Sequence, residues 1–429
     1  MNTLKNRFNK SLFISLLSIF YLLSGCSSVR KNIRNHLHNE SLKNSFHGLL
    51  IIDADSEKEL FNTNADKYFT PASNTKLVTF YTGIKLLPKN IPSLHYVVAN
   101  DTLFIEGTGD PSWLHPYLND STAIRWLKNQ KNIALYTGNS DEPRFGPGWA
   151  WEDYDTYFSP EKSTLPLYGN VVTLSKSEMD SLQVSPIEFL EYTAIKESAF
   201  KREEYQNRFY IDPEEQDTLE VPFIVNDSLT KLLLESVLQQ KITLSDHFPD
   251  QPKQTLFGME TDSIYKYMLF KSDNFLAEQL LMTASSTLSD TLGTKRAIDY
   301  MLENDLSDLE QPPRWVDGSG LSRYNLFTPR SFVQILQKLH QEVPEERLFA
   351  LMPMWGSSNT VAKWDDPETE PFLFAKSGSV GNNYNLSGYV RTKSGKLLIF
   401  SFMNNHFRTP SQEIRNTIYT TLKGLYQRY

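Results

Sequence analysis

The 429-residue sequence has little cysteine, no excess of positive charge and no long apolar run beyond its first 30 residues. Cys26 is the single cysteine, so an internal disulfide is excluded. The formal net charge of -8 argues against a nucleic-acid partner, which selects a basic face. No segment after residue 30 is apolar for long enough to span a bilayer. None of the eight histidines flanks a motif and no ligand spacing fits a metal site, so we expect neither a metal nor a cofactor.

The first 26 residues differ from the rest of the chain. A basic start containing Lys5, Arg7 and Lys10 precedes an apolar stretch at 11–23, which ends in small residues before Cys26. This layout resembles a bacterial lipoprotein signal, which predicts a signal peptide at 1–26, a lipid on Cys26 and a polar tether at 27–44. An ordinary cleaved signal or an uncleaved anchor is the alternative. The expected location is the cell envelope, facing the periplasm, with the choice of membrane left open.

Three short motifs follow one another along the chain: Ser73-Asn-Thr-Lys76, Ser272-Asp-Asn274 and Lys376-Ser-Gly378. Ser-x-x-Lys alone means little, because the chain also has this spacing elsewhere, for example at Ser263 and Lys266. In this order, however, the motifs supply the parts of a site that acylates a serine without histidine.

The residue types suggest a role for each motif. Ser73 begins a predicted helix, and Lys76 lies three residues later on the same face, where a lowered pKa would make it the base. Ser272 is predicted to relay a proton, and Asn274 to hold a substrate carbonyl and steady Lys76. Lys376 is expected to bind a substrate carboxylate on a strand edge that can pair with an extended peptide.

The apolar pattern interleaves strands and helices, which predicts an α/β fold with strands from both ends of the chain in one sheet. Strands are expected at 48–53, 59–62, 372–376, 384–391 and 396–403, and helices at 74–87, 329–341 and 411–427. Helical periodicity at 262–286 contains the Ser-Asp-Asn motif or breaks at it. Residues 96–250 look like a mixed or β-rich insert, and the pattern at 171–222 does not define a layout.

Other segments complete a resemblance to the D-alanyl-D-alanine carboxypeptidase/endopeptidase family, the class C low-molecular-mass penicillin-binding proteins. The first motif is extended by its preceding residues to Pro71–Lys76. The further segments are Gly107–Pro111, Gly148–Asp153, Asp317–Arg323 and Asn385–Val390. The resemblance implies a transpeptidase/β-lactamase-like domain made of residues 45–95 and 251–429, with the inserted region at 96–250. It also implies that peptidoglycan stem peptides are the substrate and that β-lactams acylate Ser73.

The resemblance further assigns substrate contacts. Asp153, Phe158 and Arg323 match the positions that hold the diamino acid of the stem peptide. Ser377 and Gly378 are expected to meet the substrate on the strand, and Ser379 to complete the oxyanion hole with the Ser73 amide. Ser377 stands where threonine is commoner, and the hydroxyl is kept.

Two other functions remain open from the sequence alone: a serine β-lactamase, and a catalytically silent cell-wall-binding homologue. The balance between carboxypeptidase and endopeptidase activity and the oligomeric state are also open.

Overall fold

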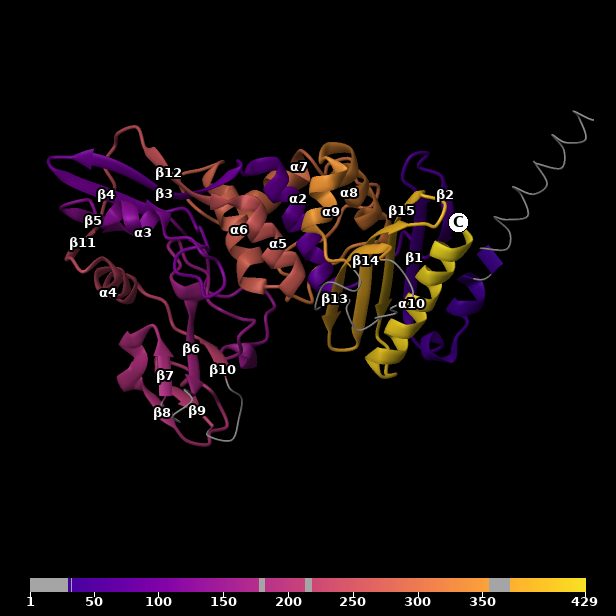
Figure 1. Cartoon of the computed structure of the whole chain (residues 1–429), viewed down its shortest axis with the longest axis horizontal. Coiled ribbons are helices and arrows are strands. Elements are labelled where there is room, and N and C mark those ends of the chain that lie inside the picture. Colours follow the sequence, from indigo (N-terminus) through magenta and orange to yellow (C-terminus); the bar gives the residue numbers. More distant parts are fainter. Residues whose placement is uncertain (1–29, 32, 177–181, 213–217, 355–370) are drawn as a thin grey trace, which may run out of the picture. The chain divides into compact units, whose positions relative to one another are not determined.

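The computed structural model describes residues 30–31, 33–176, 182–212, 218–354 and 371–429, so the predicted signal with Cys26 lies outside the described residues (Figure 1). The chain divides into two compact units. The first unit contains Met1–Pro71, Phe327–Glu345 and Pro353–Tyr429, and the second contains Ala72–Leu326 and Glu346–Met352. The second unit is therefore formed by two segments that interrupt the sequence of the first.

The first unit is built on a five-stranded antiparallel sheet. Its strand order is β13 (Leu373–Val380), β14 (Asn383–Arg391), β15 (Leu397–Asn405), β1 (Phe46–Asp53) and β2 (Glu59–Thr63). The prediction that strands from both ends of the chain share one sheet is confirmed by the pairing of β1 with β15. Both strands carry apolar runs, and β15 is buried along its full length. Their pairing in the middle of the sheet removes both runs from water.

Two helices cover this sheet. Side chains on one face, including Leu49 and Phe400, form a core cluster with Ile414 and Ile418 of α10 (Ser411–Arg428). The alternate residues of the strands point to the other face. There α8 (Pro329–Glu342) contacts β1, β14 and β15, and the Tyr389 hydroxyl donates to the Leu336 carbonyl. The short helix η1 (Glu40–Leu42) lies against α10, and α9 (Glu345–Leu351) follows α8 along the chain.

The first two motifs lie in the second unit and are surrounded by helices. A short 3-10 turn, η2 (Ala72–Thr75), leads into α2 (Lys76–Leu86), which packs on α6 (Asn274–Ser286) and α5 (Thr261–Lys271). Helix α7 (Thr294–Glu303) also packs on α6. The stretch from Phe275 to Ser285 is buried, so α6 is the central helix of this group.

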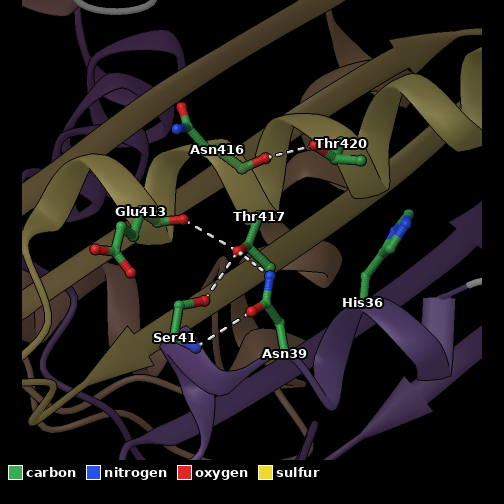
Figure 2. Close-up of a pocket in the computed structure, with 7 residues that line it drawn as sticks. All are labelled: His36, Asn39, Ser41, Glu413, Asn416, Thr417 and Thr420. Carbon is green, nitrogen blue, oxygen red and sulfur yellow. Dashed lines mark hydrogen bonds between the residues drawn. The ribbon is translucent and has the colours of Figure 1, made fainter.

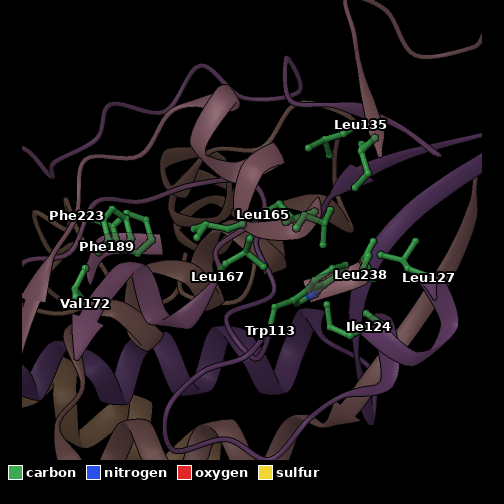
Figure 3. Packing of buried hydrophobic residues seen from close by; sticks show 14 of the residues in the cluster. Trp113, Ile124, Leu127, Leu135, Leu165, Leu167, Val172, Phe189, Phe223 and Leu238 are labelled. Atoms are coloured by element: carbon green, nitrogen blue, oxygen red, sulfur yellow. The ribbon is translucent and has the colours of Figure 1, made fainter. Parts of the chain in front are cut away.

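A second sheet lies in the same unit and has mixed direction. Its order is β11 (Ile242–Ser245), β5 (Ile133–Tyr136), β4 (Thr102–Gly107), β3 (Asn90–Ala99) and β12 (Gln254–Glu260), with β5 parallel to both neighbours. Leu135 of this sheet packs with Ile124 of α3 (Thr122–Leu127) and Leu238 of α4 (Asp227–Leu238) in one apolar core, part of which Figure 3 shows.

Short strands fill the region that the sequence pattern left undefined. The described parts of 171–222 form β6 (Val171–Lys176), β7 (Leu182–Ser185) and β10 (Thr218–Pro222) in one sheet, and β8 (Thr193–Ile195) with β9 (Phe209–Ile211) in another. Two 3-10 turns accompany them, η4 (Tyr168–Asn170) and η5 (Ile187–Tyr192). Within the described residues, no helix has the length and apolar character needed to cross a bilayer.

Candidate active site

The nucleophile segment is a tight turn into a buried helix. Ala72 has a left-handed backbone (φ 48°), and Ser73 lies in the 3-10 turn η2 (Ala72–Thr75), so α2 begins two residues later than the sequence predicts. Between Pro71 and Phe80, Ser73 is the one residue that is not fully buried. The turn therefore presents a single serine from an otherwise closed surface.

Lys76 sits in a cage of three acceptors. Its ammonium nitrogen, Nζ, lies 3.0 Å from Ser73 Oγ, 2.6 Å from Asn274 Oδ1 and 2.8 Å from the Ser319 carbonyl oxygen. An ammonium group donates to all three acceptors, whereas a neutral amine has two N–H groups and one lone pair. If the amide and carbonyl oxygens take the two N–H groups, the lone pair is left for the Ser73 hydroxyl. This geometry suits a base that accepts the proton of Ser73.

Burial makes the neutral form of Lys76 accessible. The side chain is fully buried, and the loss of water lowers its pKa from 10.5 to about 8, against the opposing effect of the carboxylates of Asp273, Glu278 and Asp317. A lysine in this range is a far better proton acceptor at neutral pH than an exposed one. The prediction that Lys76 lies beside Ser73 with a lowered pKa agrees with this environment.

The second motif lies at a break between two helices. Ser272 ends α5 with a left-handed backbone (φ 59°), and Asp273 caps α6 by accepting the Leu276 N–H at 2.9 Å. Asn274 then starts α6, and its amide nitrogen donates to the Phe158 carbonyl oxygen at 2.9 Å. That bond fixes the rotamer of Asn274, so its oxygen points to Lys76.

A loop at Asp317–Arg323 closes the other side of the lysine cage. Asp317 is buried and accepts from the Gly320 and Ser322 backbone N–H groups and from the Trp149 indole. A Cβ on Gly320 would lie 1.9 Å from the Ala72 carbonyl oxygen, and Gly320 has φ 80°. The loop therefore needs glycine there in order to pack against the nucleophile turn.

The Gly107–Pro111 segment is tied to the central helix α6. Gln279 donates to the carbonyl oxygens of Gly109 and Ser163, at 2.9 and 2.8 Å, and accepts the Ser163 N–H at 3.1 Å. Gly109 has φ 87°, a conformation that favours glycine. This segment therefore supports the helix that carries Asn274.

The three residues predicted to hold the diamino acid lie in two segments that pack together. Asp153 ends the short turn η3 (Trp151–Asp153), Phe158 contacts Asn274 through its carbonyl, and Arg323 is exposed at the end of the glycine loop. The Asp317–Arg323 loop is joined to the chain just before Gly148–Asp153 by the Ser322 hydroxyl, which donates to the Pro147 carbonyl oxygen at 2.6 Å. Substrate contacts at these residues stay a prediction.

The third motif belongs to the first unit. Lys376, Ser377, Gly378 and Ser379 lie on β13, the edge strand of its sheet; Lys376 is buried and donates to the Ser377 carbonyl oxygen at 2.6 Å. In the same unit, the Asn385 amide donates to the carbonyl oxygens of Thr70 and Pro71, just before the chain enters the second unit. The roles predicted for the residues of β13 stay predictions.

Sequence reasoning missed Glu278 and Ser319. Glu278 lies one helical turn after Asn274, a spacing that places both on one face of α6 and could have revealed it. Ser319 belongs to the Asp317–Arg323 segment, but nothing in the sequence indicates that its carbonyl would reach Lys76.

The first unit also has a polar hollow of about 260 Å³ between its N-terminal segment and α10, shown in Figure 2. The Thr417 hydroxyl there bonds with the Ser41 hydroxyl at 3.0 Å and accepts from the Asn39 amide at 3.4 Å. These polar groups join η1 to α10, and none of the residues predicted to form the site lines the hollow.

Comparison with known proteins supports the resemblance found in the sequence. The model of the D-Ala-D-Ala carboxypeptidase 3 (S13) family matches residues 29–425. The chain is 22% identical over 401 residues to penicillin-sensitive carboxypeptidase A of Dictyostelium discoideum, covering 77% of this chain and 76% of that protein. It is 28% identical over 196 residues to D-alanyl-D-alanine carboxypeptidase DacB of Haemophilus influenzae, covering 43% of this chain and 38% of that protein.

Solved structures confirm the fold. Penicillin-binding protein 4 of Haemophilus influenzae has a TM-score of 0.72 at 19% identity, covering 92% of this chain and 99% of that one. The same protein complexed with a β-lactam gives a TM-score of 0.63 at 16% identity, covering 92% and 98% of the two chains. The predicted α/β penicillin-recognising fold is therefore confirmed.

Proposed function

This chain belongs to the D-Ala-D-Ala carboxypeptidase 3 (S13) family, and we propose that it works through an acyl-enzyme on Ser73. As a member it is a serine-type hydrolase of the D-Ala-D-Ala carboxypeptidase/endopeptidase class. The observation that carries the proposal is the contact of 3.0 Å between Lys76 Nζ and Ser73 Oγ, inside a cage that occupies the other two hydrogen-bonding positions of the amine.

The reaction follows from this geometry. Neutral Lys76 takes the proton of the Ser73 hydroxyl while Ser73 Oγ attacks the carbonyl carbon of the stem peptide. The C–N bond then breaks, and the leaving amine receives a proton, relayed by Ser272. Water hydrolyses the resulting ester and releases Ser73. β-Lactams enter the same first step, and their ring-opened ester persists because it blocks the approach of water.

Substrate binding is assigned from the family resemblance. Lys376 and Ser377 bind the terminal carboxylate, and Gly378 allows the backbone to approach closely. The N–H groups of Ser73 and Ser379 form the oxyanion hole. The side chains that hold the diamino acid are Asp153, Phe158 and Arg323.

The proposed location is the cell envelope, where peptidoglycan is found. A lipid on Cys26 and a tether at 27–44 would hold the catalytic domain at a membrane. Metabolic labelling with a fatty-acid analogue tests this anchor: label that persists in a Cys26→Ala variant would contradict it.

Intact-mass spectrometry of residues 27–429 after incubation with penicillin tests the nucleophile. We expect a stable adduct on the wild type and none on Ser73→Ala. Ser263→Ala is the matched control, because Ser263 is exposed on α5 and precedes Lys266 with the same spacing, so this variant keeps the adduct. Hydrolysed drug without an adduct would make the protein a β-lactamase. Intact drug without an adduct would favour a silent cell-wall-binding homologue.

A further inference from the structure

Glu278 is a buried acid that the acylation chemistry described above does not use. It lies on α6 one turn after Asn274 and is only 1% exposed. Burying a carboxylate is unfavourable unless hydrogen bonds or charges compensate for the lost water. The contacts of Glu278 therefore indicate what this side chain does.

The carboxylate of Glu278 holds two consecutive backbone amides of the glycine loop. It accepts the Ser319 N–H at 2.7 Å and the Gly318 N–H at 3.1 Å. The carbonyl groups of the same two residues accept from α2: Ser319 from Lys76 Nζ at 2.8 Å, and Gly318 from the Thr79 hydroxyl at 2.7 Å. The dipeptide is thus clamped between α6 and α2, and one of its four hydrogen bonds belongs to the lysine cage.

We propose that Glu278 is a positioning residue for Lys76, which fixes the Ser319 carbonyl against Nζ and so directs the lysine lone pair toward Ser73. This inference rests on the function proposed for Ser73 and Lys76. Without Glu278 the Gly318–Ser319 amides lose their acceptor, and the carbonyl is free to turn away from Nζ. The neutral amine of Lys76 then keeps only the Asn274 acceptor and can rotate, so its lone pair no longer points steadily toward the Ser73 hydroxyl.

The charge of Glu278 adds a second effect on the same lysine. Burial, followed by the nearby Asp317, raises the pKa of Glu278 to about 7, while Lys162, the Ser319 side chain and the Gly318 amide oppose the rise. The charged form of Glu278 in turn raises the pKa of Lys76, as do Asp273 and Asp317. Glu278 therefore stabilises the ammonium that forms when Lys76 takes the serine proton.

Two substitutions separate position from charge. Glu278→Gln removes the charge and one acceptor while keeping the volume, so the pKa of Lys76 should fall by about one unit. In a plot of the acylation rate constant against pH, the rise on the acid side (the acid limb) then moves to lower pH, and the maximal rate constant falls. Glu278→Ala removes the clamp, and the maximal acylation rate should fall on the order of 10²-fold, as expected for a misplaced base. Glu278→Asp keeps the charge, so its limb should stay near the wild-type pH while its maximum falls.

The matched control is Glu161→Gln. Glu161 is equally buried in the same unit, its pKa is also raised by burial, and it accepts the Val225 N–H at 2.9 Å, but it has no bond to the lysine cage. If burial of an acid matters only for stability, both Glu-to-Gln variants lower the melting temperature and neither moves the acid limb.

The experiment measures the second-order rate constant for acylation by a fluorescent penicillin from pH 6 to 10, for wild type and the four variants. In parallel, the ¹³Cε resonance of Lys76, assigned by its loss in Lys76→Arg, is titrated by NMR. A wild-type profile for Glu278→Gln, or an unshifted Lys76 titration, overturns the proposal. If penicillin fails to label wild type, the function proposed for Ser73 is wrong; the NMR titration still decides whether Glu278 controls the lysine.

Discussion

The pH dependence of acylation follows from the burial of Lys76. With a pKa of about 8, the lysine is neutral in about 9% of molecules at pH 7 and about 91% at pH 9, whereas an ordinary pKa of 10.5 would leave about 0.03% neutral at pH 7. Because the neutral form is the proposed base, the acylation rate constant should rise about tenfold from pH 7 to pH 9 and then level off.

A stopped-flow assay of a chromogenic cephalosporin or fluorescent penicillin checks this prediction. Ser73→Ala supplies the background of alkaline drug hydrolysis, which is subtracted at each pH. A rate constant that stays flat from pH 6 to 9.5 would mean that Lys76 is not the base. A rise centred near pH 10.5 would mean that its burial does not lower its pKa, and the reasoning from desolvation would be refuted.

Two further predictions concern the supports of this centre. Asn274→Ala removes the acceptor 2.6 Å from Lys76 Nζ, so acylation should fall on the order of 10²-fold with little change in melting temperature; a fall of less than twofold would contradict the orienting role. Gly320→Ala would place a Cβ 1.9 Å from the Ala72 carbonyl oxygen and should lower the free energy of unfolding by at least about 2 kcal/mol, measured by denaturant titration. Gly395→Ala has a similar φ of 86° and no atom within 4 Å, so it should show the backbone strain alone, about 1 kcal/mol; equal losses in the two variants would argue against the steric reasoning.

The parts of the site that are close in sequence could be predicted from the sequence. Lys76 is three residues from Ser73, and helical geometry alone brings such residues together. Asn274 is 198 residues from Lys76, and only the order of the motifs suggested their contact. Glu278 was missed because a glutamate in a helical pattern looks like a solvated residue, and its burial depends on the loop that folds over it.

The secondary structure was also predictable only in part. Long apolar strands such as β1 and β15 were predicted because their runs are distinct. The helical pattern at 262–286 left open whether the Ser-Asp-Asn motif lies inside a helix or at a break, and the structure shows a break at Ser272. By contrast, β8 and β9 have three residues each, too few to show a period. The helix predicted for residues 74–87 was found, but the pattern gave no sign of how deeply it is buried: every residue from Lys76 to Gly83 of α2 is buried.

The pairing of β1 with β15 has a consequence for how the protein is made. During synthesis β1 is among the first strands to leave the ribosome, while its partner β15 comes about 350 residues later, roughly 20–70 s at typical elongation rates. Throughout this time β2 can pair with one edge of β1, but the edge that later pairs with β15 stays open and can pair with other chains. A chain that stops before β13 would contain Ser73, Lys76 and Asn274 but would lack β15, so this edge of β1 would stay exposed. We therefore expect such a chain to aggregate or be degraded even though it has these three site residues.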